Sequence, residues 1–335
     1  MKKIFKVIFT IVGTVIGAGF ASGQEIYLFF NQYKEIGFIG LIISNLLTGI
    51  IIYLILKKAN SLELTSYKDL LKSTKLSENK INIFNTMVNM FLLISFYIMV
   101  AGFATYFNTQ FNIPKIIMIV ITVFICYITF NKKIEGITKI NNIIIPILII
   151  IIFFVGIKIN IIKEIETIKD LSLNNIENGM WILKSIEYSS YNSILLIPML
   201  ISIRKYSIGK EKSVSIISTT FLLILSTVVF LAIYKYQSIV NLNDIEMPMI
   251  YISNRIGNIY KYVYGIVIIF SIYSTMISAG YGLLENIENR KYSFFNKLIC
   301  ITAIVVANIS FSELVKITYP IFGILGLLQL IYVLK

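Results

Sequence analysis

Histidine is absent from this chain, and cysteine, proline, tryptophan and charged residues are scarce. The 335 residues include no His, two Cys, five Pro and one Trp, and only 14% of them are charged. Without histidine, imidazole metal sites, histidine proton relays and Ser-His catalytic triads are excluded. Cys126 and Cys300 each lie within an apolar run, which argues against a disulfide or a metal site.

Hydrophobic residues make up 57% of the chain, a composition typical of a polytopic membrane protein rather than a soluble domain. The net charge of +13 would suggest a nucleic-acid partner for a soluble protein. Here the lysines lie in short segments between apolar runs, where they set orientation in a lipid bilayer. We therefore expect the lipid bilayer as a partner, and no nucleic acid.

Ten apolar runs are long enough to cross about 30 Å of hydrocarbon. They predict an all-α polytopic membrane protein with one transmembrane domain over residues 1–335. The first five and the last five fall into two halves, 5–157 and 178–334. The predicted spans are 5–30, 36–56, 83–107, 113–130, 140–157, 179–203, 212–234, 258–287, 295–311 and 313–334.

The distribution of Lys and Arg predicts how the chain is oriented. With the N-terminus inside, the predicted cytoplasmic segments carry about twice as many Lys and Arg as the outer loops. We expect a multi-pass protein of the cell membrane with both termini cytoplasmic. In the loop before the eighth span, Pro248 is placed to begin an additional helix, which could be a lid or a plain loop helix.

The first span contains the stretch IVGTVIGAGFASGQEI, residues 11–26, which combines four glycines with a terminal Gln-Glu pair. Each glycine costs a helix interior about 1 kcal/mol relative to alanine. The segment GTVIG alone could serve close helix packing. The further glycines and a polar run in the sixth span favour a helix that opens so that its backbone can bind a ligand. The glycines are Gly13, Gly17, Gly19 and Gly23.

The sixth span carries its polar run, Tyr188 to Ser193, at a depth that matches the glycines of the first span. Interrupted helices at corresponding positions of two halves mark the binding site of an inverted-repeat transporter. The sequence thus predicts a 5+5 inverted repeat with helices 1 and 6 broken. Tyr188, Ser189 and Asn192 are expected to line the substrate pocket, and Tyr97 in the third span is a further candidate.

Three ionisable residues fall within or beside these two spans. Lys184 and Glu187 are three residues apart, the spacing of an ion pair within one helix. Function is the default interpretation of intramembrane charges, although a structural pair explains them almost as well. Glu25 is expected near the outer interface, either as a gate or cation-attracting group or merely as a solvated carboxylate. Glu25, Lys184 and Glu187 are the candidates for a gate or a proton carrier.

The eighth span carries four hydroxyl side chains at i, i+3, i+4 and i+7, which places them on one helical face. Such side chains often bond back to their own helix. Four on one face favour a lined path or an ion site. They are Ser271, Ser274, Thr275 and Ser278.

At VGTVIGAGFASGQEI the sequence resembles the bacterial YkvI family of transporters, which is similar to the amino acid–polyamine–organocation superfamily. The ten-span layout extends this resemblance over essentially the whole chain, although it is less specific than the glycine-rich first span. The resemblance implies a leucine-transporter type of fold with substrate bound at the breaks in spans one and six.

The resemblance also implies site residues by position. Val15, Ala18 and Gly19, next to Gly17, would match backbone groups that hold the ammonium and carboxylate of an amino acid. A sodium ion would be bound by groups that match the family's sodium ligands. These are the carbonyls of Gly13, Ile16 and Ser271 and the hydroxyls of Ser274 and Thr275. Phe20 departs from the family pattern, because some relatives have a polar ligand of a second sodium there. The fifth span also lacks the interior lysine that replaces sodium in some proton-coupled members.

The sequence thus predicts a secondary active transporter of a small polar solute, an amino acid or a related amine. Coupling to an ion gradient follows from the lack of an ATP-binding glycine loop with lysine, and sodium is favoured over a proton. Apart from sodium, no cofactor is expected. The alternative is a transporter-like membrane receptor that senses a solute without moving it. An intramembrane enzyme is disfavoured, because histidine and a convincing carboxylate pair are both lacking.

Overall fold

The computed structural model describes residues 2–74, 76–131, 137–162, 179–237, 239–242, 245–285 and 291–335, and the regular elements in these segments are all helices. In chain order they are α1 (Lys2–Val15), α2 (Ala18–Ser22), α3 (Gln24–Phe29), η1 (Asn31–Tyr33), α4 (Lys34–Ser61), α5 (Tyr67–Ser73), α6 (Glu78–Phe111), α7 (Lys115–Asn131), α8 (Ile137–Ile161), α9 (Met180–Ile203), η2 (Arg204–Tyr206), α10 (Glu211–Gln237), α11 (Pro248–Ile256), α12 (Asn258–Glu285), α13 (Tyr292–Val306) and α14 (Phe311–Val333).

Each predicted span coincides with one of these helices, and the first coincides with the series α1–α3. Within the described segments, six stretches have the length and hydropathy needed to cross a membrane, and three shorter apolar helices accompany them. The chain is therefore a multi-pass membrane protein, and the count of ten spans stays a prediction. The six stretches are Gln24–Ser61, Glu78–Phe111, Ile144–Ile161, Glu211–Gln237, Asn258–Leu284 and Phe311–Val333.

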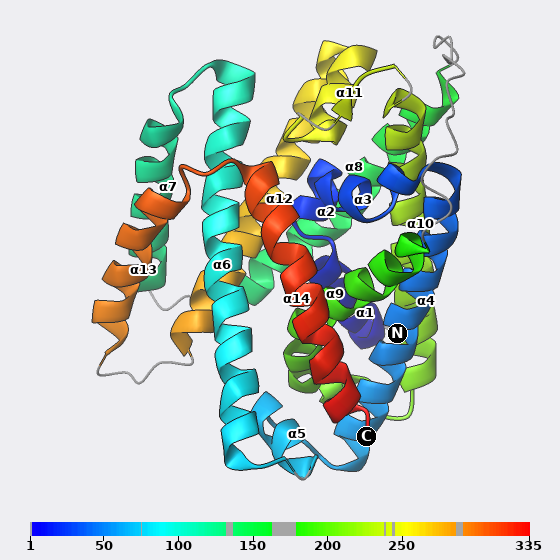
Figure 1. The fold of residues 1–335 in the computed structure, drawn as a ribbon, viewed down its shortest axis with the longest axis vertical. Coiled ribbons are helices and arrows are strands. Elements are labelled where there is room, and N and C mark those ends of the chain that lie inside the picture. Colours follow the sequence, from blue (N-terminus) through cyan, green and yellow to red (C-terminus); the bar gives the residue numbers. More distant parts are fainter. Residues whose placement is uncertain are drawn as a thin grey trace.

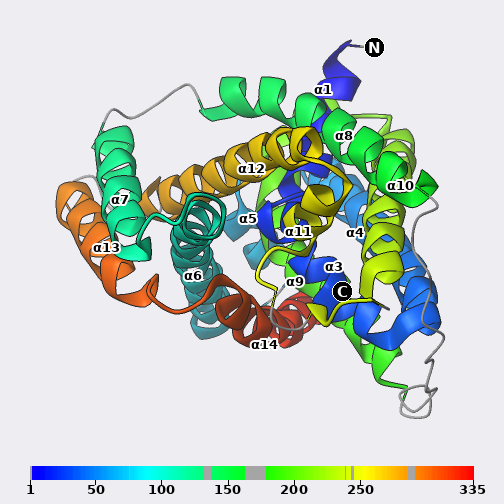
Figure 2. The ribbon, with the colours of Figure 1, turned by 90° about the horizontal axis from the view of Figure 1, so that it is seen from above.

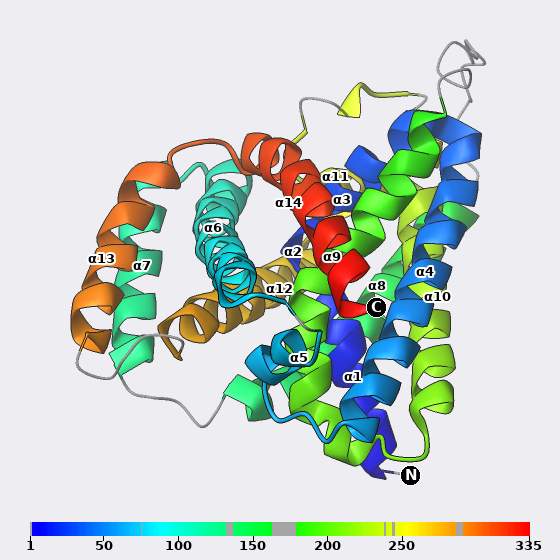
Figure 3. The same ribbon diagram turned by 60° about the horizontal axis from the view of Figure 1, so that its bottom comes forward.

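The helices form a bundle with a peripheral pair (Figure 1). Helices α7 and α13 pack against each other beyond α6, as Figure 3 shows clearly. Seen from above in Figure 2, the short helices α2 and α3 lie in the interior, where they contact α9, α10, α11, α12 and α14. The arrangement surrounds the glycine-rich segment of the first span with protein instead of lipid.

Helix α9 is continuous from Met180 to Ile203, so the predicted break in the sixth span is wrong. The polar side chains that suggested a break bond back to carbonyls of their own helix. Ser189 Oγ donates to the Ile186 carbonyl at 2.9 Å, and Asn192 Nδ2 donates to the Tyr188 carbonyl at 2.9 Å. Because the helix itself satisfies these groups, they do not need it to open.

Helix α14 approaches the backbone of α9 at two glycines. A Cβ on Gly323 would lie 2.9 Å from Glu187 Cβ, and one on Gly326 would collide with the backbone carbonyl of Ser190. The Glu187 Cβ is fixed to the α9 backbone and the Ser190 carbonyl belongs to it, so neither can move aside without distorting the helix. The small residues therefore set the distance between α9 and α14.

Gly326→Ala is expected to destabilise the protein by about 1–3 kcal/mol, because the added methyl overpacks the α9–α14 contact. Gly282→Ala on α12 is the matched control, since a Cβ there would meet Leu92 at an ordinary 3.6 Å. The measurement is thermal unfolding of both purified variants in detergent. Equal melting temperatures would show that α9 and α14 are not held at this distance.

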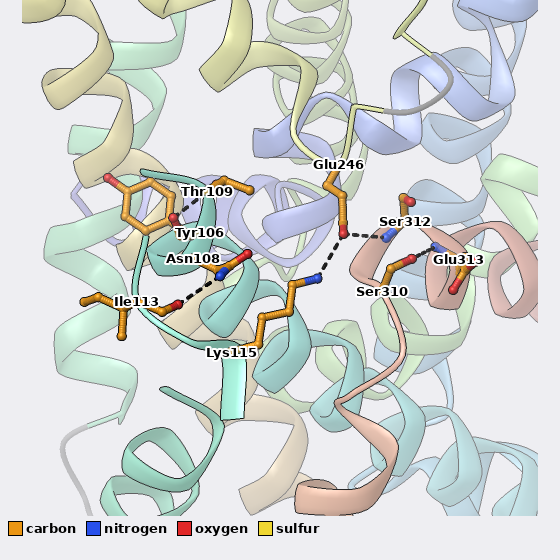
Figure 4. Close-up of polar contacts among 9 residues, drawn as sticks. All are labelled: Tyr106, Asn108, Thr109, Ile113, Lys115, Glu246, Ser310, Ser312 and Glu313. Carbon is orange, nitrogen blue, oxygen red and sulfur yellow. Dashed lines mark hydrogen bonds and ion pairs between the residues drawn. The ribbon is translucent and has the colours of Figure 1, made fainter. Parts of the chain in front are cut away.

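Pro248 begins α11, which confirms the predicted additional helix. Just before it, Glu246 joins three segments (Figure 4). Its carboxylate pairs with Lys115 Nζ at 3.2 Å, at the start of α7. It also accepts the backbone N–H of Ser312 at 3.3 Å, in the first turn of α14. Glu246 thus ties the α11 segment to α7 and α14.

Helix α5, outside the apolar stretches, begins with a complete capping box. Asp69 Oδ2 accepts the Thr65 hydroxyl at 2.7 Å and the Ser66 backbone N–H at 2.9 Å, while Ser66 Oγ accepts the Asp69 N–H at 3.1 Å. These hydrogen bonds, led by that from Thr65, hold the pKa of the Asp69 carboxyl below its usual range. The reciprocal bonds stabilise a helix too short to persist alone.

Candidate functional site

The first span is interrupted between α1 and α2. The Gly17 N–H donates to the Val15 carbonyl at 2.9 Å, whereas a continuing α-helix would direct it to the Gly13 carbonyl. Gly17 has extended backbone angles, φ −82° and ψ −173°. The Gly13 carbonyl is therefore released from helical bonding, and the first N–H groups of α2 have no partner within their own helix.

A second joint follows at Gly23, between α2 and α3. Its φ of +81° lies in the left-handed region, which glycine adopts without steric cost. Its N–H closes the end of α2 by donating to the Phe20 carbonyl at 3.0 Å. From α12, the Tyr264 hydroxyl donates to the Ala21 carbonyl at 2.9 Å. Helix α2 is thus a buried five-residue segment between two glycine joints, held from α12.

Glu25 on α3 turns back over α2 and is only 3% exposed. Its carboxylate accepts a hydrogen bond from the Tyr191 hydroxyl on α9, and the Tyr319 hydroxyl and the Phe20 backbone N–H are further donors. The predicted alternative of a merely solvated interfacial carboxylate is therefore wrong. The carboxylate finds room because Gly19 has no side chain: a Cβ there would occupy the same space.

Aromatic rings from α3, from the residue that follows it, from α9 and from α14 pack together beside this carboxylate. We call them the aromatic cluster: Phe29, Phe30, Tyr188, Tyr191 and Tyr319. Tyr191 is stacked between Tyr319, at a centroid distance of 4.8 Å, and Phe29, at 5.7 Å. Tyr188 stands edge-on to Phe30 at 5.0 Å and to Phe29 at 5.4 Å. The cluster joins α3, α9 and α14 beside the Glu25 carboxylate.

The predicted ion pair within the sixth span is confirmed. Lys184 Nζ lies 2.6 Å from Glu187 Oε2, and the two side chains are 18% and 8% exposed. The same ammonium lies 5.8 Å from the centre of the Phe29 ring. The pair therefore borders the aromatic cluster, and whether either residue acts as a gate or proton carrier stays a prediction.

The structure brings together part of the predicted substrate set. Val15, Ala18 and Gly19 are buried at the break, and Tyr188 belongs to the aromatic cluster. Ser189 and Asn192 use their side chains on their own helix, as described above. The Tyr97 hydroxyl instead pairs with Thr302 Oγ1 at 2.6 Å, which joins α6 to α13 in the peripheral part of the bundle. Tyr97 is thus placed apart from the cluster.

The predicted sodium ligands are also partly brought together. A Cβ on Gly17 would lie 3.5 Å from Thr275 Oγ1, so this α12 hydroxyl borders the break. The Ser271 hydroxyl is buried and has no hydrogen-bond partner among the described residues. Gly13 has a packing role as well, because a Cβ there would collide with the Ile145 side chain on α8. Ile16 is buried at the break itself, and Ser278 is exposed.

Sequence reasoning missed Tyr319, Tyr264 and Phe29. Tyr319 precedes Pro320 within an apolar run, and Tyr264 lies near the start of the eighth span. Their spacing along the chain gives no signal that they meet α2 and α3. A polar tyrosine inside a predicted span was the one available hint, and it does not identify a partner.

A separate groove of about 670 Å³ lies between α6 and α14. Its lining is mainly aliphatic and aromatic, with Asn82, Thr86 and Thr318 as its few polar side chains. Such a lining offers little to a polar solute, so the break and the aromatic cluster form the candidate site.

No family model matches the chain. Its fold is shared with membrane transporters of known structure. A manganese transporter from Eremococcus coleocola aligns with a TM-score of 0.68 and 15% identity, covering 99% of this chain and 78% of that one. A Na+-coupled sialic acid symporter in a substrate-bound outward-open state aligns with a TM-score of 0.58 and 13% identity, covering 96% and 76%. These neighbours are transporters and not enzymes.

The chain is thus a membrane protein with a transporter fold of the leucine-transporter type. It is homologous to the uncharacterized membrane protein YkvI of Bacillus subtilis. The two are 26% identical over 95% of this chain and 92% of YkvI. A second relative, the uncharacterized protein YyaD of Bacillus subtilis, is 23% identical over 97% of this chain and 94% of its own length.

Proposed function

We propose that the protein is a secondary active transporter of a small polar solute, an amino acid or a related amine, which binds at the break between α1 and α2. The observation that carries this proposal is the buried segment α2 between its two glycine joints. The N–H groups of Ala18 and Gly19, which have no partner within α2, and the released Gly13 carbonyl offer both donors and acceptors to a solute. The manganese and sialic acid transporters with the same fold are in keeping with a transport role.

A 5+5 inverted repeat is the proposed architecture, with halves 5–157 and 178–334. Equivalent helices pack against each other: α1 with α9, α4 with α10, α6 with α12, and α7 with α13. Contacts between unlike helices are also matched, since α1–α10 corresponds to α9–α4 and α8–α12 to α14–α6. Such pairing is expected of two halves related by a pseudo-twofold axis in the membrane plane.

Both termini are proposed to be cytoplasmic in the cell membrane. The positive-inside distribution of Lys and Arg supports this orientation. In Figure 1 both ends of the chain lie toward the end of the bundle that carries α5. Their common side is compatible with an even number of spans.

A sodium ion is the proposed coupling ion, held between the break and α12. The carbonyls of Gly13, Ile16 and Ser271 and the hydroxyls of Ser274 and Thr275 would be its ligands. The proximity of Thr275 to Gly17 supports this location, as does the buried hydroxyl of Ser271, which has no hydrogen-bond partner among the described residues. A proton carried by Glu25 or Glu187 is the alternative. Linkage requires that solute and sodium tighten each other's binding by the same factor.

Replacing both Ser274 and Thr275 with alanine is expected to weaken the sodium dependence of solute binding before it damages folding. Two neutral oxygen ligands are lost from the ion, while α12 keeps its helical backbone. The measurement is solute affinity titrated against sodium. Ser278→Ala, on the same helical face but exposed, is the control and should leave the sodium dependence unchanged. Solute uptake driven equally well by a pH gradient in sodium-free buffer would contradict a sodium site.

Uptake into proteoliposomes tests the proposed function. A radiolabelled solute that stabilises the purified protein should accumulate against its gradient when an inward sodium gradient is imposed. Stabilisation by the solute without any uptake or exchange would contradict transport and favour a receptor.

A further inference from the structure

The groove between α6 and α14 opens on the outside of the bundle. Its floor consists of buried side chains such as Phe84, Met87 and Phe322, which are 4% to 8% exposed. Its rims carry exposed side chains such as Ile83, at 64%, and Ile321, at 51%. In a protein that spans a membrane, an apolar surface of this kind faces the acyl chains of lipids rather than water.

The groove follows one half of the two helices. On α6 its lining runs from Asn82 to Ile94, which is about 18 Å at 1.5 Å per residue. One leaflet of a bilayer provides about 15 Å of hydrocarbon. Helix α6 leaves the end of the bundle that carries α5, and α14 returns toward that end (Figure 1). The groove therefore has the length of a single leaflet and begins at the α5 end of the bundle.

An ammonium group stands where the groove begins. Lys80 Nζ lies 5.3 Å from the centre of the Tyr332 ring, and that ring stands edge-on to Phe84 in the floor at 5.7 Å. Neither ion pair formed within the described segments includes Lys80. Asn82 lines the groove two residues further along α6. The α5 end of the groove thus presents a positive charge and an amide, whereas the rest of the groove is mainly apolar.

A charged end followed by an apolar groove has the two chemistries of an anionic phospholipid. Basic side chains near the membrane surface attract anionic headgroups. Asn82 and Thr86 can donate hydrogen bonds to the phosphate and to the ester groups below it. The aliphatic and aromatic floor suits an acyl chain. An apolar helix from a second copy of this chain could fill the groove, but it would bring no counter-charge to Lys80.

We propose that the groove between α6 and α14 binds one anionic phospholipid from the leaflet on the α5 side. The phosphate lies at Lys80 and Asn82, and an acyl chain follows the groove toward Ile94. The site is separate from the break in the first span and does not depend on the proposed transport function. Because the lipid contacts both helices in the folded protein, its binding stabilises the fold.

Two phospholipids with identical acyl chains test the proposal on the purified full-length protein, after removal of lipid in a neutral detergent. Phosphatidylglycerol is compared with phosphatidylcholine, whose headgroup has no net charge. Native mass spectrometry measures the lipid bound, and thermal unfolding measures the stabilisation. We expect one tightly bound phosphatidylglycerol, with phosphatidylcholine bound at least fivefold more weakly. Glycerol 3-phosphate, which lacks acyl chains, should not stabilise the protein.

Lys80→Gln removes the charge at the end of the groove and should lower phosphatidylglycerol affinity roughly fivefold, to the level of phosphatidylcholine. Lys212→Gln is the matched control, because it removes an exposed lysine at the start of α10, outside the groove. This control should retain the preference for phosphatidylglycerol.

Met90→Trp places a bulkier side chain in the groove and should weaken binding of both phospholipids. Met90 is 54% exposed, so the larger ring can be accommodated without disrupting the core. Leu46→Trp on α4, at a position 53% exposed and outside the groove, is its control and should bind both lipids normally.

Three outcomes would overturn the proposal. Equal affinity for the two phospholipids, or full phosphatidylglycerol affinity in Lys80→Gln, would show that Lys80 does not hold a headgroup. Undiminished binding in Met90→Trp would place the lipid outside the groove. A lipid-free dimer that Met90→Trp dissociates would assign the groove to a second copy of the chain.

Discussion

Replacing Gly19 with alanine is expected to weaken solute binding at least tenfold while the protein still folds. The added Cβ would collide with the Glu25 carboxylate, which is confined by Tyr191 and Tyr319 and cannot turn aside freely. The displaced carboxylate would press on the break between α1 and α2, so the backbone groups offered to a solute would lose their geometry. Titration of a solute that stabilises the purified protein measures the effect.

Gly282→Ala is the control for this substitution, because its Cβ meets only ordinary contacts on another helix. Gly282→Ala should unfold at a temperature close to that of the unaltered protein, whereas Gly19→Ala should fold but lose about 1–3 kcal/mol of stability to overpacking. If Gly19→Ala binds the ligand normally, the glycine serves packing of α2 and the carboxylate of Glu25 is not part of the site.

Gly23→Ala is expected to lower stability by about 2–5 kcal/mol and to abolish uptake. The left-handed backbone at φ +81° costs an L-residue about 1–2 kcal/mol. The new Cβ would also lie 2.8 Å from Met249 Cγ and 2.9 Å from Ile233 Cδ1, an overpacking that costs a further 1–3 kcal/mol. Relief of both strains requires α2 and α3 to reorient, which moves Glu25 away from its tyrosines.

Gly209→Ala separates the two contributions. Gly209 also has a left-handed backbone, at φ +73°, but a Cβ there would meet no atom within 4 Å. It should show the backbone cost alone, with uptake per folded protein unchanged. Thermal unfolding and proteoliposome uptake of both variants provide the comparison. Equal behaviour of Gly23→Ala and Gly209→Ala would show that the joint between α2 and α3 is not tightly packed.

The sequence was informative where the signal was local. Glycines at 17 and 23 stand at the two joints around α2, Pro248 begins α11, and the i, i+3 spacing of Lys184 and Glu187 predicts their ion pair. Each of these depends on residues within one turn of chain. The apolar runs likewise coincide with the helices, since hydrophobic length alone predicts them.

Contacts between distant segments could not be predicted in this way. The partners of Glu25 lie on α9 and α14, and nothing in the spacing of Tyr191 or Tyr319 connects them to the first span. The break expected in α9 failed for a different reason. Ser189 and Asn192 look like helix-opening residues in sequence, yet each can bond a carbonyl one turn back and leave the helix intact.

Hydrogen–deuterium exchange with and without the best-binding ligand tests most directly whether solute binds at the break in the first span. Peptides covering residues 16–25 should exchange more slowly when ligand is present, because the N–H groups of α2 gain a partner or are shielded. Peptides from the apolar groove, residues 82–94 and 318–332, should exchange at the same rate in both states. Protection of the groove without any change at residues 16–25 would contradict the account and place the ligand between α6 and α14.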